Sequence, residues 1–286
     1  MGSKDMIFYP KNVITCQGKK IDLSVPKIMG IINVTPDSFY SKSRHDINNA
    51  LKTCEEMLKD GALFVDIGGY SSRPGAVHVA VDEEKRRTIP IIESIAHEFP
   101  ELFISIDTFR SDVAQTALDA GASIINDISG GELDEAMFEL AAARDVPYIL
   151  THMKGTPQNM QVNPSYNEIT SEILASLRNR LTILQTMNVS DVIIDPGFGF
   201  GKTLTQNYQL LSELSQFNEL TVPILVGISR KSMIYKLLDS SPEEALNGTS
   251  VLHTISLQKG AQILRVHDVK DAAECITLWS ACANLD

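Results

Sequence analysis

Eight short apolar runs recur along this chain, and each one ends on polar residues that can bind anions, amides or metals. The runs cover residues 27–33, 63–68, 102–107, 123–127, 147–152, 191–195, 223–229 and 262–267. A strand that is apolar along its length and polar at its carboxyl end is typical of a buried parallel sheet with a site along one rim. Segments with helical periodicity separate the runs. Eight strand–helix units of roughly 30 residues predict an α/β fold, a (β/α)₈ TIM barrel whose active site lies at the carboxyl ends of the strands.

Helices are predicted after the strands, over residues 46–60, 82–99, 111–119, 134–144, 167–187, 205–214, 232–238 with 243–259, and 269–283. Several of them start near an Asp, Ser or Asn that could act as an N-cap. Ahead of the first barrel strand, residues 6–25 contain strand-like runs around a Gln17-Gly18 turn, which predict a β-hairpin that closes the bottom of the barrel. No linker or low-complexity tract interrupts the sequence, so we expect one domain over residues 1–286, with the barrel at 27–283.

The charge of the chain limits its partners. A formal net charge of −11 and a pI near 5.0 argue against nucleic acid and anionic membranes as general partners. Any site for an anion must therefore be a local cluster of cations. Cysteines occur without CxxC pairing, which suits a reducing compartment and predicts ordinary packing roles for Cys16, Cys54, Cys275 and Cys282. The first residues contain no apolar leader, and we expect a cytoplasmic protein.

Two stretches after the first two strands are long for barrel loops. Residues 34–45 and 70–81 exceed the roughly 2–6 residues that are usual for such connections, which makes them candidate lids over the site. A third segment, residues 196–203, looks like a nucleotide-binding P-loop. That match fails because Pro196 stands where the first glycine is required. What remains is a glycine-rich turn directly after Asp195, where small residues let a flat ligand approach the backbone.

The predicted rim gathers carboxylates, amides and cations. Taken singly, Asp and Asn at strand ends cap helices about as often as they bind ligands. Together they offer the mixed donors and acceptors that an amino-oxo heterocycle needs, and the cations suit phosphate. We assign Asp66 to structure and His253 to packing, and leave the role of His152 open. The full set is Asn33, Asp66, Asp107, Asn126, Asp127, His152, Asp195, Lys231, Arg265 and His267, with Arg73 from the second long loop.

Seven motifs that contain these residues resemble, in order, the successive motifs of the dihydropteroate synthase family. They are Asn33-Val-Thr-Pro-Asp-Ser-Phe39, Gly69-Tyr-Ser-Ser72-Arg73-Pro-Gly75, Ser105-Ile-Asp107-Thr, Asn126-Asp-Ile, Asp195-Pro-Gly-Phe-Gly-Phe200, Ser229-Arg-Lys231-Ser232 and Arg265-Val-His267-Asp. The resemblance covers nearly the whole chain. It implies a barrel enzyme, usually a homodimer, that joins 6-hydroxymethyl-7,8-dihydropterin diphosphate to 4-aminobenzoate and releases diphosphate in folate biosynthesis. It also implies Mg²⁺ as the cofactor and sulfonamides as inhibitors.

The resemblance further implies roles for individual residues. The catalytic residues would be Asp107, Lys231, Arg265 and His267. The pterin would be bound by Asp107, Asn126, Asp195, Lys231 and Arg265. The diphosphate would be bound by Asn33, Ser72, Arg73, Arg265 and His267, with the metal at Asn33. The 4-aminobenzoate would be bound by Phe39, Ser72, Phe200 and Ser232.

One loop departs from the family pattern, and two other functions stay open. The family commonly continues its first motif with Ser-Asp-Gly-Gly, whereas residues 40–45 here read Tyr-Ser-Lys-Ser-Arg-His. We therefore carry over only Asn33 and Phe39 from this loop. A methyltetrahydrofolate–corrinoid methyltransferase would share Asp107, Asn126 and Asp195 but would not need the cations for diphosphate. A non-catalytic pterin-binding paralogue is the second alternative, and diphosphate release from the two substrates separates all three.

Overall fold

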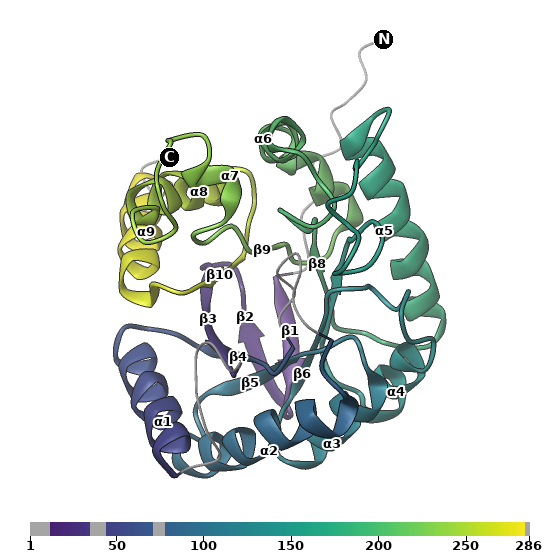
Figure 1. Ribbon diagram of the computed structural model, residues 1–286, viewed down its shortest axis with the longest axis vertical. Helices are drawn as coiled ribbons and strands as arrows, with labels where there is room; N and C mark the ends of the chain where they lie inside the picture. The colour runs from purple at the N-terminus through teal and green to yellow at the C-terminus, as the bar shows by residue number, and fades with distance from the viewer. Residues whose placement is uncertain (1–11, 35–43, 71–77, 284–286) are drawn as a thin grey trace.

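The computed structural model describes residues 12–34, 44–70 and 78–283. Parallel strands form a barrel in the centre of the molecule, and helices surround it (Figure 1). The strands are β3 (Lys27–Asn33), β4 (Phe64–Gly68), β5 (Phe103–Asp107), β6 (Ile124–Asp127), β7 (Tyr148–Thr151), β8 (Val192–Asp195), β9 (Leu225–Val226) and β10 (Ile263–Val266). Their order is β8-β7-β6-β5-β4-β3-β10-β9. A parallel bridge between Ile194 and Ile224 joins β8 to β9, so the predicted α/β barrel is confirmed.

The helices follow the strands as the periodicity predicts. They are α1 (Arg44–Lys59), α2 (Val81–Glu98), α3 (Ser111–Asp119), α4 (Ala136–Arg144), α5 (Ile169–Thr186), α6 (Leu204–Ser212), α7 (Ser232–Tyr235), α8 (Leu246–Gln258) and α9 (Val269–Ala283), with the 3₁₀ helix η1 (Leu214–Leu220). The ends differ from the predicted ranges by at most three residues, but η1 was not predicted. None of the described helices has the length and hydropathy that a membrane span requires.

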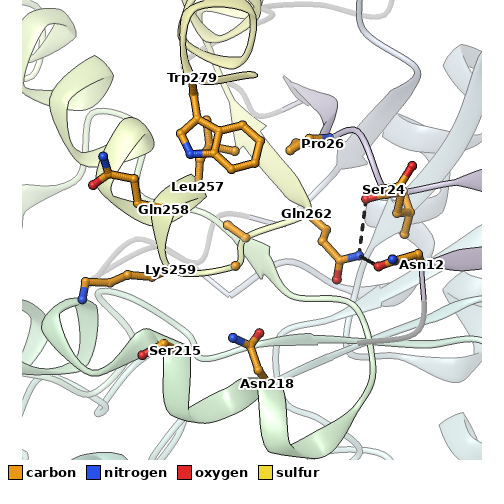
Figure 2. A pocket seen from close by; sticks show the side chains of 13 residues that line it. Asn12, Ser24, Pro26, Ser215, Asn218, Leu257, Gln258, Lys259, Gln262 and Trp279 are labelled. Carbon is orange, nitrogen blue, oxygen red and sulfur yellow. Dashed lines mark hydrogen bonds between the residues drawn. The ribbon is translucent and has the colours of Figure 1, made fainter. Parts of the chain in front are cut away.

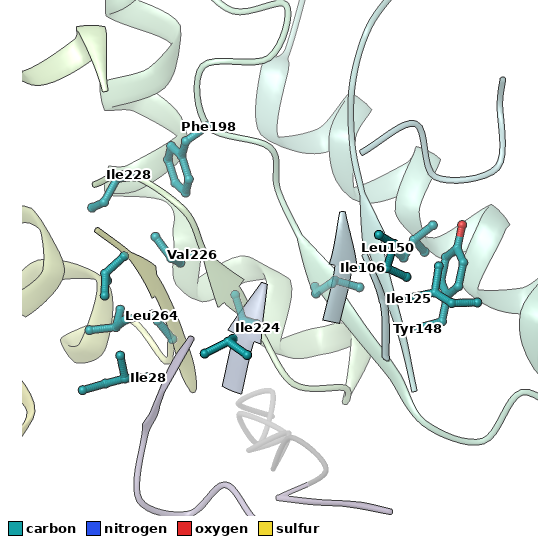
Figure 3. Close-up of a cluster of buried hydrophobic side chains, with 14 of the residues drawn as sticks. Ile28, Ile106, Ile125, Tyr148, Leu150, Phe198, Ile224, Val226, Ile228 and Leu264 are labelled. Atoms are coloured by element: carbon teal, nitrogen blue, oxygen red, sulfur yellow. The ribbon is translucent and has the colours of Figure 1, made fainter. Parts of the chain in front are cut away.

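Alternation along the strands builds the outer core. Ile28, Ile106, Ile125 and Leu264 are buried and face the ring of helices, where they pack with other aliphatic side chains (Figure 3). Because successive side chains of a strand point to opposite faces, the residues on either side of them face the barrel interior. Each strand is buried on both faces, one against the helices and the other inside the barrel. This explains why the strand sequences are apolar at nearly every position.

A separate apolar cluster fills the lower end of the barrel. Each strand contributes one inward side chain, and the hairpin of β1 (Val13–Cys16) and β2 (Lys19–Asp22) contributes Ile14, Cys16 and Ile21. The strand residues are Met29, Phe64, Phe103, Ile124, Ile149, Ile193, Leu225 and Ile263. Gln17 and Gly18 connect the two hairpin strands, and both have positive φ, as a two-residue hairpin turn requires. The predicted hairpin at the bottom of the barrel is confirmed.

Several local predictions are wrong. The run 223–229 was predicted as a full strand, but only Leu225–Val226 forms one, with an isolated bridge at Ile224. The chain turns after Ile228, where Arg230 adopts a left-handed φ of 52°. Side-chain N-caps were expected on several helices, yet the side chains before α2, α3, α5 and α8 accept no capping hydrogen bond. A capping box occurs at Thr203, ahead of α6. Cys282 is exposed, so the packing role predicted for all four cysteines holds only for Cys16, Cys54 and Cys275.

Candidate active site

The barrel interior changes from apolar to polar two residues further along six of its eight strands. The pairs of apolar plug residue and polar residue above it are Phe64 and Asp66, Phe103 and Ser105, Ile124 and Asn126, Ile149 and Thr151, Ile193 and Asp195, and Ile263 and Arg265. Residues two apart on a strand share a face, so this polar layer also faces the axis, nearer the carboxyl ends. The site predicted at this rim therefore has a floor of charged and amide groups on an apolar plug.

Arg265 lies at the centre of that floor and is held by two carboxylates. Its Nε donates to Asp66 Oδ2 at 2.5 Å, and its Nη2 donates to Asp107 Oδ2 at 2.6 Å. Asp66 Oδ2 also accepts from Asn126 Nδ2 at 2.9 Å. Asp66 is fully buried, and its hydrogen bonds join β4 to Arg265 and Asn126, two residues predicted to bind the pterin. This is the structural role that the sequence predicted for Asp66.

Burial and neighbouring charges perturb both partners of this contact. Burial acts to lower the pKa of Arg265, but the carboxylates of Asp66 and Asp107 outweigh it and raise that pKa above its ordinary value. Burial raises the pKa of Asp107 to about 7, Arg265 opposes the shift, and the nearby Asp66 carboxylate adds to it. Arg265 therefore stays charged, whereas Asp107 can gain or lose a proton near neutral pH.

Asp195 and Lys231 are two further buried charged groups of the site, and each influences the pKa of the other. Burial raises the pKa of Asp195, and the ammonium of Lys231 opposes this. Burial lowers the pKa of Lys231 to about 8, against the attraction of Asp195. A Cβ at Gly227 would lie 3.7 Å from Asp195 Oδ2, 3.9 Å from Lys231 Nζ and 4.0 Å from Arg265 Cβ. The glycine thus leaves open the space that these three side chains border.

Two of the residues predicted to bind 4-aminobenzoate lie beside this pair. The Lys231 ammonium is 4.5 Å from the centroid of the Phe200 ring, and it donates to the carbonyl oxygen of Phe198. Ser232 follows Lys231 directly as the first residue of α7. A cation held over an aromatic face in a buried site stabilises both groups in place. The other two residues, Phe39 and Ser72, lie outside the described residues, as do Arg73 and most of the two predicted lids.

His267 follows β10 and is supported by Ser229. Ser229 Oγ accepts from the backbone N–H of His267 at 3.1 Å and lies 3.1 Å from its Nδ1. Arg230 and Asp268, next to these two residues, form a two-pronged ion pair of 2.8 and 2.9 Å. This pair joins the turn after β9 to the end of β10, and so fixes the backbone that carries Lys231 and His267. This ion pair was not predicted from the sequence, although Arg230 and Asp268 lie within two of the seven family motifs.

Two residues of the predicted rim set lie elsewhere. Asp127 points away from the barrel axis and accepts from Tyr148 Oη at 2.6 Å and from the N–H groups of Ser129 and Gly131. It belongs to the packing of the β6–α4 connection because it is the strand neighbour of the inward Asn126. His152 also lies on the outer face, 3.2 Å from Lys202 Nζ. His253 is buried in α8, which confirms its assignment to packing. Asn33 ends β3 at the same rim, paired with Gly68.

A hollow of about 360 Å³ lies at the opposite end of the barrel (Figure 2). Its lining includes Leu23 and Pro26 beside the hairpin, Gln262 before β10 and Trp279 from α9. Gln262 Nε2 donates to Asn12 Oδ1 at 2.8 Å and to the carbonyl oxygen of Leu23 at 3.3 Å. These bonds seal the lower end of the barrel, where conserved features of this fold serve stability rather than catalysis. We therefore place the functional site at the other rim.

Comparisons with known proteins find one family over most of the chain. Residues 29–267 match the family described as pterin binding enzyme. The dihydropteroate synthase of Escherichia coli (strain K12) is 42% identical over 268 residues, which cover 93% of this chain and 94% of that protein. The solved dihydropteroate synthase of Yersinia pestis with a sulfonamide drug has a TM-score of 0.90, 39% identity, and coverage of 95% of this chain and 99% of that one. The Xanthomonas albilineans enzyme with 4-aminobenzoic acid has a TM-score of 0.89 and 37% identity, with coverage of 96% and 99%.

The chain belongs to the pterin-binding enzyme family. Its barrel with the N-terminal hairpin matches the solved dihydropteroate synthases over 95–96% of its length. Within the family it is a dihydropteroate synthase, a transferase of folate biosynthesis. These likenesses decide against the corrinoid methyltransferase and the non-catalytic paralogue that the sequence left open.

Proposed function

We propose that this site joins 6-hydroxymethyl-7,8-dihydropterin diphosphate to 4-aminobenzoate. The carbon–oxygen bond to the diphosphate breaks, a carbon–nitrogen bond to the arylamine forms, and the amine loses a proton. The observation that carries the proposal is the convergence of Asp107, Asn126, Asp195, Lys231 and Arg265 around one space at the barrel mouth. This set offers carboxylate and amide groups to an amino-oxo ring and cations to its leaving group.

The pterin roles follow from the chemistry of each side chain. Asp195 would accept from the pyrimidine N–H and amino group, since its Oδ2 faces the open space at Gly227 while its Oδ1 accepts from Gly197 N at 2.8 Å. Asn126 and Asp107 would complete the ring edge. Lys231 would donate to acceptor atoms of the ring, and Arg265 would lie over its face and reach toward the phosphates. Catalysis would then consist mainly of holding the ring and stabilising the departing anion.

Diphosphate and magnesium are proposed to bind together at the rim. The cations would be Arg265, His267 and Arg73, with Ser72 and Asn33 as polar contacts. In the described part of the chain, no group of three or more His, Cys, Asp or Glu side chains could hold a metal alone. That fits Mg²⁺, which often takes one or two protein oxygens and completes its shell with substrate phosphates and water. Asn33 would supply the protein oxygen, and the bound ion would neutralise the charge of the phosphate oxygens.

We also propose an oligomeric state, a cellular location and a domain organisation for this protein. Large apolar side chains are exposed at the end of α7, on α8 and on α9: Leu237 (57%), Leu238 (57%), Val251 (51%) and Leu278 (70%). Such side chains on neighbouring elements support a homodimer interface on this side of the barrel. The buried free thiols of Cys16, Cys54 and Cys275 suit the cytoplasm. We further propose that residues 1–286 form one domain.

The decisive test is turnover by the purified protein. With both substrates and Mg²⁺ present, we expect stoichiometric release of diphosphate and formation of dihydropteroate. Omission of 4-aminobenzoate or chelation of Mg²⁺ should abolish product, and Asp195→Asn serves as a matched variant with an unchanged backbone. Sulfonamides should inhibit competitively with 4-aminobenzoate, because they share its aniline and shape. No diphosphate release under these conditions would refute the proposed reaction.

A further inference from the structure

Lys202 is a buried lysine behind the site, and the reaction proposed above gives it no role. It is 3% exposed and follows the glycine-rich turn of residues 196–201. Its Nζ donates to the carbonyl oxygens of Gly197 at 2.7 Å and Phe200 at 3.0 Å, and lies 3.2 Å from His152 Nδ1. A fourth acceptor, the His152 carbonyl oxygen, is 3.4 Å away. An ammonium group has three donors, and here it meets acceptors from both ends of the turn and from the end of β7.

The turn depends on side chains for its shape. Gly197, Gly199 and Gly201 have φ of 73°, 82° and 60°, and no other type of residue adopts such a backbone so readily. Every carbonyl oxygen from residue 197 to 201 accepts from a side chain. The donors, in order, are Lys202, Lys231, Gln161, Lys202 and Tyr166. Lys202 is the donor that acts twice, so it closes the turn on itself.

The same turn carries two parts of the site. The N–H of Gly197 donates to Asp195 Oδ1 at 2.8 Å, and Phe200 lies under the Lys231 ammonium at 4.5 Å. Phe200 is the described aromatic wall of the proposed 4-aminobenzoate subsite. A shift of the turn would move Phe200 more than Asp195, because Asp195 is also fixed by the pairing of β8 with β7.

We propose that Lys202 is a positioning residue for the arylamine: it ties the glycine-rich turn to the end of β7 and so fixes Phe200 as a wall of the 4-aminobenzoate subsite. The proposal rests on the function proposed above for this site. It also gives His152 the role that the sequence left open, as the acceptor that anchors Lys202. Burial lowers the pKa of His152 well below its ordinary value, which keeps the ring neutral, and its Nδ1 accepts from Lys202 when the ring proton is on Nε2.

Burial also lowers the pKa of Lys202 to about 7, and the Asp195 carboxylate opposes this shift. The hydrogen-bonding geometry nonetheless matches the charged form, since the three nearest acceptors take one proton each. The three protons of the ammonium are directed at the carbonyl oxygens of Gly197 and Phe200 and at His152 Nδ1, so we expect its replacement to act through the turn.

The test replaces Lys202 by methionine, which has similar length and no donor. The matched control is Lys154→Met, because Lys154 flanks the same turn but is half exposed and bonds to the carbonyl oxygen of Ser165. In Lys202→Met, we expect KM for 4-aminobenzoate to rise at least about tenfold, the range that a misplaced contact group can cost. The dissociation constant for the pterin diphosphate should change less than threefold by calorimetry. The control should stay within twofold of wild type in both.

Amide hydrogen exchange supplies a readout that does not need turnover. In Lys202→Met, exchange of amides 197–201 should accelerate at least about tenfold while the barrel strands keep their protection. Lys202→Gln, which keeps one donor group, should lie between wild type and Lys202→Met in both measurements. If wild type proves inactive, the proposed function fails, but the exchange result still shows whether Lys202 holds the turn.

Three outcomes would overturn the proposal. One is an unchanged KM for 4-aminobenzoate in Lys202→Met. Another is an equal loss for both substrates with faster exchange throughout the barrel, which would make Lys202 a general stabilising residue. The third is failure of both Lys202 variants to fold while Lys154→Met folds, since Lys202 would then be required for folding rather than for position.

Discussion

Replacement of Asp66 would test how the barrel holds its central cation. Asp66 Oδ2 accepts from both Arg265 Nε and Asn126 Nδ2, whereas its buried Oδ1 has no partner among the described residues. An asparagine can place its single oxygen at the shared position and its amide nitrogen at the unpartnered one. Asp66→Asn therefore removes the charge and keeps both hydrogen bonds, whereas Asp66→Ala removes both.

The expected costs follow from these contacts. Removal of one partner from a buried ion pair costs about 3–5 kcal/mol of stability. Arg265 keeps Asp107 at 2.6 Å, so Asp66→Ala should fall at the lower end, about 3 kcal/mol. Asp66→Asn should cost about 1–2 kcal/mol, the difference between hydrogen bonds to a charged and to a neutral acceptor. At this chain length about 1 kcal/mol corresponds to about 2 °C in Tm.

The pH dependence adds a second signature. Asp107 has a pKa raised from 3.8 to about 7, so the folded state keeps a proton that the unfolded state has lost. Stability from this group is therefore full below about pH 4 and declines as the pH rises toward 7. The Asp66 carboxylate contributes to that raised pKa, and both variants remove it. The decline should then be shallower, and the penalty of each variant should be smaller at high pH than at low pH.

Urea unfolding of wild type and both variants, at several pH values between about 4 and 8, measures these differences directly. A near-identical cost for Asn and Ala would show that the charge, not the hydrogen bonds, holds Arg265. A cost below about 1 kcal/mol for Asp66→Ala would refute the whole account, because a buried pair cannot lose its partner so cheaply.

Three other changes probe the ring site. Asp195→Asn should reduce pterin affinity by well over tenfold in calorimetry, as expected for loss of a buried charged contact worth about 2–5 kcal/mol; binding within threefold of wild type would contradict its role. Gly227→Ala places a methyl group 3.7 Å from Asp195 Oδ2 at no steric cost to the fold, so Tm should hold while pterin affinity falls, and equal affinity would place the ring elsewhere. Because the pKa of Lys231 is lowered to about 8, pterin binding should weaken as pH rises through that value, and Lys231→Met should lack this pH dependence.

Alternation made much of the site predictable from the sequence. Asp107, Asn126, Asp195 and Arg265 stand at the ends of apolar runs, and the period of two places them on the inner face. The same rule, applied one residue further, shows why Asp127 is not part of the site. Consecutive polar residues at the carboxyl end of a strand point to opposite faces of the sheet. Counting in steps of two from the apolar plug residue shows which of them point into the barrel.

Contacts between distant strands could not be predicted in this way. Asp66 meets Asn126 across 60 residues of sequence and Arg265 across 199. The sequence shows polar residues at three strand ends. It does not show that one oxygen of Asp66 accepts hydrogen bonds from both Asn126 and Arg265. Lys202 was hidden for a different reason: it stands in a segment considered only as a failed P-loop. The sequence did contain a signal, because Lys202 follows three glycines and two phenylalanines. In such a segment the lysine amine is more easily surrounded by backbone carbonyl oxygens than by solvent.

The proposed diphosphate site requires a chain of net charge −11 to bind an anion, and the structure suggests how its carboxylates permit this. Asp66 and Asp107 hold Arg265 in place. If both carboxylates stayed ionised, however, their two negative charges would exceed the single positive charge of Arg265. Burial already raises the pKa of Asp107 to about 7. We expect an anion beside Asp107 to raise that pKa further, so that Asp107 would take up a proton if the diphosphate binds there. The buried carboxylates can thus position the cation in the empty site and leave its charge available to the substrate.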